Sequence, residues 1–261
     1  MKKILKIIMC ILSCYALIGL GWITKDMIIH EQCKNGIPIL GYHGVVEDQE
    51  KKLNYAYNTY FMSVSELEKQ FAYLHDHQFQ TLTMNEVNEY YHQQKQVPEK
   101  CVCITFDDGY KNFLTLVKPL LQKYNLKATC FVIGHKAISD NPLYLQKDEL
   151  INDDYVQFYS HSYDLHHIAH LPKQKLIETL SVKEIQQDFL NNENIVSSDY
   201  FAFPYGVTSS NAKQYLASSQ VKLAFGYNQN RTMTYHDDPY CLPRYHMFAG
   251  MPMFLFQWWI E

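Results

Sequence analysis

The chain has 261 residues, of which 15% are aromatic, and a formal net charge of -4. A mildly acidic chain with scattered lysines and no basic stripe lacks the electrostatic footprint of a nucleic-acid-binding protein, so a nucleic-acid partner is excluded. Behind an N-terminal segment, the remaining length suits one α/β domain of ordinary size.

The N-terminus carries an apolar run at residues 7–23 that contains no charged residue and follows three lysines. A run of this length can span the hydrocarbon core as a helix, and lysines at its start favour a cytoplasmic N-terminus. No Ala-x-Ala-like cleavage site follows it. We therefore expect residues 1–24 to anchor the chain in the cytoplasmic membrane, residues 25–36 to form a linker, and residues 37–261 to form one extracytoplasmic domain. A cleaved signal peptide, which would give a secreted protein, is the alternative.

The first part of the domain alternates apolar runs with amphipathic segments. A charged stretch rich in Asn and Tyr, residues 47–58, is expected to be an exposed loop. Ser63, with Glu66 three residues on, forms a capping box that starts a helix. The expected strands are residues 37–42, 79–82 and 101–106, and the expected helices are residues 63–77 and 84–94.

The same alternation continues to the C-terminus. The expected strands are residues 128–133, 155–160, 200–203, 221–225 and 240–245, and the expected helices are residues 112–124, 146–152, 181–192, 211–218 and 253–260. Repeated strand–helix units imply a parallel sheet. The fold class is therefore α/β, and we expect a distorted (β/α) barrel that the last helix closes.

Chemically versatile residues follow several of the expected strands. His43, Asp107, His161 and Tyr205 each come at or just after the end of an apolar run, and His246 follows the last one. In a (β/α) barrel the C-terminal strand ends meet at one rim, which holds the active site. We therefore expect these side chains to converge.

Two neighbouring carboxylates and two imidazoles suggest a metal site. Asp107 and Asp108 repel each other when both are charged, and a cation beside them removes that cost. His161 and His166, five positions apart, add imidazoles, and carboxylate plus imidazole is a normal ligand set for a catalytic zinc-type ion. An ordinary Asp-Asp-Gly turn and a solvated His-rich loop are the simpler alternatives.

Seven cysteines are present, but they form no C-x-x-C pair. A zinc ribbon and a thioredoxin-like site are therefore excluded. We expect buried free thiols, with a bridge between Cys103 and Cys130 on neighbouring strands left open.

Three motifs resemble the signatures of the polysaccharide deacetylases, the NodB-homology group also called carbohydrate esterase family 4. These motifs are Thr105-Phe106-Asp107-Asp108-Gly109, His161 to His166, and Phe203-Pro204-Tyr205-Gly206. The likeness runs through residues 37–261 and includes Gly41-Tyr42-His43 near the start and Leu242-Pro243-Arg244 near the end. Within the family, the chain is most similar to the branch that deacetylates the poly-N-acetylglucosamine of biofilms, the intercellular adhesin deacetylase type.

The resemblance implies metal-dependent N-deacetylation of an extracellular N-acetylglucosamine polysaccharide. Asp108, His161 and His166 would hold a divalent metal, with zinc the default and cobalt, nickel or iron also compatible with these ligands. Asp107 would be the general base, and a backbone N–H at Tyr205 would help to hold the oxyanion.

The proton donor to the leaving amine is expected to be His43 rather than His246. His43 ends the first strand, and in the exopolysaccharide branch that this chain resembles, a Tyr-His pair near the start recurs. A neighbouring carboxylate could keep the acid protonated by raising its pKa.

Two departures from the family pattern matter. The histidines of the second motif are usually four apart, whereas here the spacing is five and His167 is a competitor. The exopolysaccharide branch resembles the longer spacing, so His166 is assigned. The third motif usually carries an Arg that orients the base, and Ala202 stands there instead. The base must then be held in another way. The alternatives are a peptidoglycan deacetylase and a catalytically weak glycan-binding protein, which would act beside other exopolysaccharide synthesis proteins.

Overall fold

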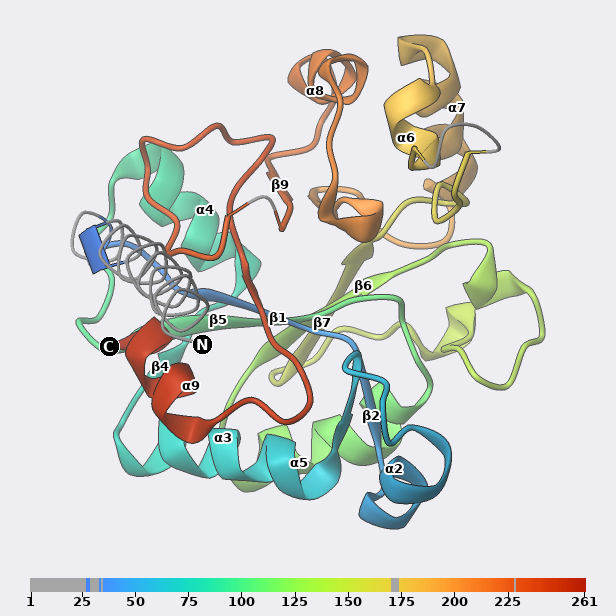
Figure 1. The fold of residues 1–261 in the computed structure, drawn as a ribbon. Helices are drawn as coiled ribbons and strands as arrows, with labels where there is room; N and C mark the ends of the chain where they lie inside the picture. The colour runs from blue at the N-terminus through green and yellow to red at the C-terminus, as the bar shows by residue number, and fades with distance from the viewer. Residues whose placement is uncertain (1–26, 29–32, 34, 170–173, 228) are drawn as a thin grey trace, which may run out of the picture.

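The computed structural model describes the chain except for residues 1–26, 29–32, 34, 170–173 and 228 (Figure 1). The expected anchor, residues 1–24, lies outside the described residues, as does most of the expected linker. Among the residues that are described, no helix combines the length and the apolar character needed to cross a membrane.

One sheet of parallel strands forms the centre of the molecule (Figure 1). In spatial order its strands are β10 (Tyr245–His246), β1 (Ile39–Tyr42), β5 (Cys101–Phe106), β6 (Ala128–Val132), β7 (Val156–Ser160), β8 (Tyr200–Ala202) and β9 (Leu223–Phe225), with β4 (Gln80–Thr81) also paired to β5. Most of these strands are buried along their whole length, which explains why they read as continuous apolar runs. The expected parallel α/β architecture is confirmed.

The sheet curls round until its two ends approach each other. Phe225 at the end of β9 forms a parallel bridge with Leu242, just before β10. The Leu242 N–H donates to the Ala224 carbonyl, and the Gly226 N–H donates to the Leu242 carbonyl, each at 2.9 Å. Because an isolated bridge closes the ring in place of a full ladder, the barrel is distorted, as expected.

Helices cover the outside of the sheet, α3 and α5 on one side and α7 and α8 on another (Figure 1). Their bounds are α3 (Val64–Asp76), α4 (Met84–Gln93), α5 (Lys118–Lys123), α6 (Leu176–Thr179), α7 (Val182–Asn192), α8 (Ser210–Ala217) and α9 (Met253–Ile260). The predicted capping box at the start of α3 is present, with Ser63 and Glu66 each accepting from the other's backbone N–H.

The exposed loop predicted at residues 47–58 is wrong in part, because α2 (Asp48–Asn54) forms there. This helix has no buried residue, and acidic side chains in its first turn complement the helix dipole. Lys51 Nζ then donates to the carbonyls of Tyr55 and Asn58 at 2.8 and 2.7 Å. Polar contacts, which apolar periodicity does not reveal, thus fix this segment.

Further details differ from the expected elements. The helix expected at residues 146–152 is only a 3-10 turn, Lys147–Glu149, and the strand expected at residues 240–245 is limited to β10. The short strands β2 (Gly44–Val46) and β3 (Phe61–Ser63) pair with each other beside the barrel. The helix expected at residues 112–124 starts as a π-helical turn, Phe113–Val117, that leads into α5. The thiols of Cys103 and Cys130 are free and buried, so the expectation of free thiols is confirmed.

Candidate active site

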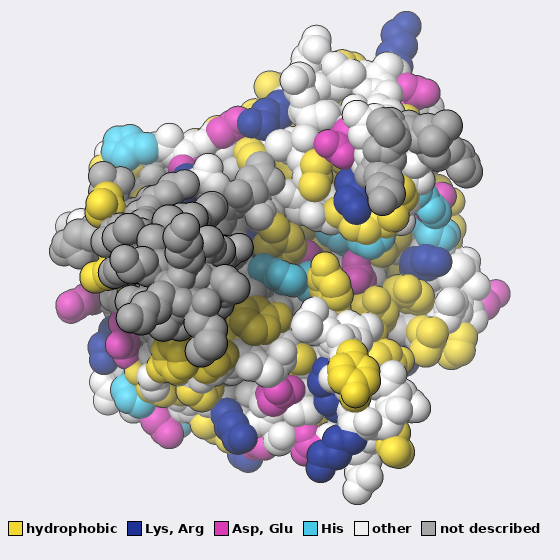
Figure 2. Space-filling model, viewed as in Figure 1, with side chains coloured by type: hydrophobic (Ala, Val, Ile, Leu, Met, Phe, Trp, Pro, Cys, Tyr) yellow, Lys and Arg dark blue, Asp and Glu magenta, His cyan; other side chains and the backbone are white. Residues whose placement is uncertain are grey.

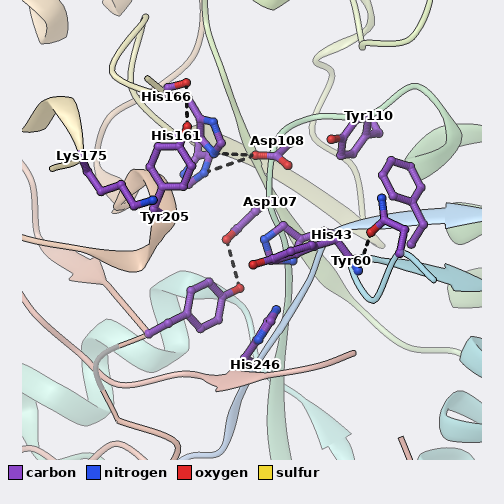
Figure 3. Close-up of a pocket in the computed structure, with 13 residues that line it drawn as sticks. His43, Tyr60, Asp107, Asp108, Tyr110, His161, His166, Lys175, Tyr205 and His246 are labelled. Atoms are coloured by element: carbon purple, nitrogen blue, oxygen red, sulfur yellow. Dashed lines mark hydrogen bonds and ion pairs between the residues drawn. The ribbon is translucent and has the colours of Figure 1, made fainter. Parts of the chain in front are cut away.

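A cavity of about 420 Å³ opens at the C-terminal ends of the strands. Figure 2 shows it as a hollow near the middle of one face, with histidine side chains inside and apolar ones around it. Six residues singled out from the sequence line this cavity: His43, Asp107, Asp108, His161, His166 and Tyr205 (Figure 3). His246, the other candidate acid, lines it as well. The predicted convergence on one rim is therefore observed.

The turn after β5 brings both carboxylates into the cavity. Asp107 still continues the sheet, because its N–H donates to the Tyr42 carbonyl at 2.9 Å. Asp108 and Gly109 then take left-handed backbone conformations, with φ of 74° and 73°. Aspartate tolerates this region better than most residues, and glycine takes it freely. The reversal at Asp108 keeps its side chain on the same side of the strand end as Asp107.

Asp108, His161 and His166 form a compact ligand set. Asp108 Oδ1 lies 3.5 Å from Nε2 of each histidine. The three ligand atoms all lie within 4.8 Å of one another, a spacing at which one metal ion could contact all three. Among the described residues, this is the one cluster of His, Cys, Asp or Glu side chains whose ligand atoms are spaced to hold a metal ion. His161 is oriented by its other nitrogen, because its Nδ1–H donates to the Ala202 carbonyl at 2.8 Å.

The electrostatics of Asp108 fit a cation. Its carboxyl is buried, and Oδ1 has no hydrogen-bond partner among the described residues. Burial and the neighbouring Asp107 charge raise the pKa of Asp108 to about 7. A buried carboxylate oxygen that lacks a hydrogen-bond partner is costly, and a divalent ion at this point would satisfy it. The donor set, one carboxylate and two imidazoles, suits zinc and related ions.

The loop between the two histidines resolves the question of their unusual spacing. His167 turns away from Asp108, and its Nε2 lies 2.8 Å from Asp164 Oδ1. His166 points into the cavity, where its ring stacks on Tyr205 with centroids 4.2 Å apart. The Tyr205 hydroxyl also donates to the His166 carbonyl at 3.2 Å. The geometry therefore favours His166 over His167 as the second histidine of the set.

Asp107 is held by two residues to which the sequence assigned no role. Arg244 donates from two nitrogens to Oδ1 and Oδ2 of Asp107 at 2.7 and 2.8 Å, and it also donates to Thr105 Oγ1. The Tyr227 hydroxyl donates to Oδ2 at 3.0 Å. Burial alone would raise the pKa of Asp107, but the Arg244 charge outweighs it, and the pKa falls well below its usual range. Asp107 is therefore ionised at neutral pH.

Arg244 fills the role left open at Ala202. Its guanidinium is completely buried and stacks on the Tyr227 ring, 4.1 Å from the centroid. It reaches Asp107 from the segment just before β10, which the closed barrel places beside β1 and β5. The signal in the sequence was the Leu242-Pro243-Arg244 run, which carried the family likeness but no assigned function.

Two glycines leave room for Tyr227. A Cβ at Gly41 would lie 2.1 Å from the Tyr227 hydroxyl, and a Cβ at Gly206 would lie 2.5 Å from its ring. Gly206 also has a left-handed φ of 66°. Any larger side chain at either position would push the Tyr227 ring away, so both glycines help to define the place of the Asp107 carboxylate.

Both candidate acids lie at the cavity. The rings of His43 and His246 are 5.5 Å apart, and Tyr227 lies 6.0 and 5.2 Å from them, measured between ring centroids. Burial lowers the pKa of His43 to about 4, although Asp107 acts in the opposite direction. Asp107 thus raises the pKa of His43 as expected, but desolvation of the imidazolium is the larger effect, so the expectation that His43 is kept protonated near neutral pH is wrong.

Comparison with known proteins identifies the family of this chain. A family model described as polysaccharide deacetylase matches residues 94–224, half of the chain. YxkH of Bacillus subtilis (strain 168), which carries a polysaccharide deacetylase name, is 32% identical over 170 residues, covering 62% of this chain and 55% of its own length. The poly-beta-1,6-N-acetyl-D-glucosamine N-deacetylase of Staphylococcus aureus (strain MSSA476) is 26% identical over 197 residues, covering 71% of this chain and 67% of the relative.

The fold recurs in a solved structure. The deacetylase PplD of Streptococcus pyogenes, solved in complex with acetate, superposes with a TM-score of 0.76 at 21% identity. The superposition covers 87% of this chain and 98% of PplD. Motifs, fold and matched model agree, and the chain belongs to the polysaccharide deacetylase family.

Proposed function

We propose that this protein is a metal-dependent N-deacetylase of poly-β-1,6-N-acetyl-D-glucosamine. The observation that carries the proposal is the ligand set of Asp108, His161 and His166 beside an ion-paired Asp107 in one cavity. The name of the Staphylococcus aureus relative supports this substrate.

The chain's own residues divide the work of amide hydrolysis. Asp108, His161 and His166 would hold a divalent cation, zinc by default, which when bound would supply a lowered pKa for a water and polarisation of the acetamide carbonyl. Asp107 is positioned to take the proton from the attacking water. A backbone N–H at Tyr205, which lies at the cavity rim, can donate to the oxygen that becomes negative.

His43 is the proposed donor to the leaving amine. Its low pKa makes its imidazole neutral at rest near neutral pH, so it must first receive a proton and then becomes a strong acid. The proton taken by Asp107 is the natural source, because the low pKa of Asp107 makes it release that proton readily. An amine that receives a proton as the C–N bond breaks avoids leaving as an anion.

The buried Arg244 bears on the alternative of a weak glycan-binding protein. That alternative drew its support from the missing arginine at Ala202. Arg244 contacts Asp107 from the segment just before β10. The missing arginine therefore no longer argues for a protein that has lost catalysis. The proposed location remains outside the cytoplasmic membrane, tethered by residues 7–23, and it rests on the apolar run behind three lysines.

Acetate release tests the proposal and its substrate. The purified full chain, loaded with zinc, is incubated with poly-β-1,6-N-acetyl-D-glucosamine and, in parallel, with peptidoglycan. We expect acetate and free amines from the first glycan at a much higher rate. Faster release from peptidoglycan would move the assignment to that substrate, and release from neither would refute deacetylation.

A further inference from the structure

The cavity is lined by a positively charged side chain, that of Lys175, which has no part in the proposed mechanism. Lys175 lines the cavity, and its Nζ lies over the ring of Tyr205, 4.1 Å from the centroid (Figure 3). The Tyr205 ring in turn stacks on the His166 ring, with centroids 4.2 Å apart. The ammonium is thus within about 8 Å of the His166 ring, since each step of this stack is about 4 Å.

The backbone fixes Lys175 relative to the metal-ligand loop. Lys175 forms an antiparallel bridge with Ile168, and the next N–H, that of Leu176, donates to the His167 carbonyl at 2.9 Å. The Lys175 N–H also donates to Glu178 Oε2 at 2.8 Å at the start of α6. The backbone from which this side chain projects is therefore tied to the loop that carries His166.

No carboxylate within the described part of the chain pairs with the Lys175 ammonium, whereas several other lysines form ion pairs. Of the two carboxylates in the cavity, Asp107 is already neutralised by Arg244, and Asp108 faces the two histidines. The charge of Lys175 therefore acts on whatever occupies the cavity.

We propose that Lys175 is a specificity-determining residue that disfavours sugar units next to an already deacetylated one. The inference rests on the proposed function, whose reaction turns a neutral acetamide into an amine that is protonated near neutral pH. A glycan segment that presents such an ammonium near the site meets the fixed charge of Lys175, whereas a fully acetylated segment does not. Deacetylation along the polymer would then be spaced, with acetylated units left between free amines.

The size of the effect follows from the distance. A glycan ammonium held as far from Lys175 as the His166 ring, about 8 Å, would be repelled enough to weaken binding on the order of 2-fold in water-like surroundings and 30-fold at the screening typical of a protein surface. Because the interaction is between exposed or half-exposed charges, added salt should weaken it.

The experiment compares two oligosaccharides with the full, zinc-loaded chain. One is a β-1,6-N-acetylglucosamine tetramer, and the other is the same tetramer with one free amine. The ratio of their kcat/KM values is measured at low and high salt, and calorimetry gives the Kd of the fully deacetylated tetramer, which cannot react. Lys175→Gln removes the charge, Lys175→Arg keeps it, and Lys183→Gln is the matched control, because Lys183 is exposed on α7 and does not line the cavity.

We expect the natural protein and Lys175→Arg to prefer the acetylated tetramer, with less preference at high salt. Lys175→Gln should reduce the preference about 2- to 30-fold and tighten binding of the deacetylated tetramer, and Lys183→Gln should change neither. An unchanged preference in Lys175→Gln would overturn the inference. So would an equal loss on both tetramers, which would show that Lys175 contacts neutral sugar. Absence of acetate release by the natural protein would instead defeat the proposed function.

Discussion

Replacing Arg244 with methionine leaves the Asp107 carboxylate buried without its ion-pair partner. Arg244 and Asp107 are 0% and 2% exposed, and two charge-assisted hydrogen bonds join them. Breaking a buried pair by removing one partner costs about 3–5 kcal/mol, because the remaining charge is left uncompensated. We expect Arg244→Met to lower the free energy of unfolding by this amount.

The double variant separates the ion pair from lost packing. Asp107→Asn combined with Arg244→Met leaves no buried charge at this point, so it should be less destabilised than Arg244→Met alone. The coupling energy of the cycle should reach about 2 kcal/mol or more, near the upper part of the range for residues in direct contact. Lys222→Met is the control, because the exposed Lys222–Asp199 pair should contribute about 0–1 kcal/mol.

The assay is urea unfolding of chelator-treated protein, followed by circular dichroism, so that metal binding does not add to the measured stability. Initial rates of the zinc-loaded variants are measured beside it, and Arg244→Met should lose most of its turnover because Asp107 loses its orientation. A cost below about 1 kcal/mol for Arg244→Met, or additive effects in the cycle, would refute the view that this pair holds the base.

Four further outcomes are expected. Asp108→Asn should lose bound zinc and activity together, whereas Asp107→Asn should keep zinc and lose turnover, as measured by metal analysis beside acetate release; activity in a chelated sample would contradict this. His43→Ala should cost about a hundredfold or more in kcat with zinc retained, and His246→Ala much less; the reverse order would make His246 the acid. Since burial lowers the pKa of His43 from 6.5 to about 4, its folded state favours the neutral ring. The contribution of His43 to the free energy of unfolding should be fully present above pH 6.5 and lost as the pH falls through 4. In urea unfolding of the chelated protein, His43→Gln should make the free energy of unfolding fall less over this pH range. Fractionation should find the full chain in membranes, and recovery of a shortened soluble form would point to a cleaved signal.

Much of the fold could be predicted because each buried strand is a short apolar run that ends in a polar residue. The bounds of β5 and α9 match the expected ranges, residues 101–106 and 253–260. The same regularity placed His43, Asp107 and His161 at strand ends, so their convergence followed from the barrel alone.

The contacts that hold Asp107 could not be predicted in this way. Arg244 and Tyr227 are 137 and 120 residues away from it along the chain. Arg244 reaches Asp107 because β10 lies against β1, and Tyr227 follows β9, which is bridged to the segment before β10 when the sheet closes. Neither residue follows a local pattern that marks it as a partner of Asp107. Helix α2 was missed for a different reason, since it buries no side chain and therefore shows no apolar periodicity.

The site combines residues from the stretch that matches the family model with residues that precede and follow it. Residues 94–224, which match the family model, contain every proposed metal ligand, whereas Arg244, Tyr227 and His43 lie outside that stretch. Substitutions in the first strand and the last segments would therefore change the surroundings of Asp107 and the proposed acid while leaving the proposed metal ligands in place. Laboratory variants of this enzyme could follow the same route, altering its pH range without rebuilding the metal centre.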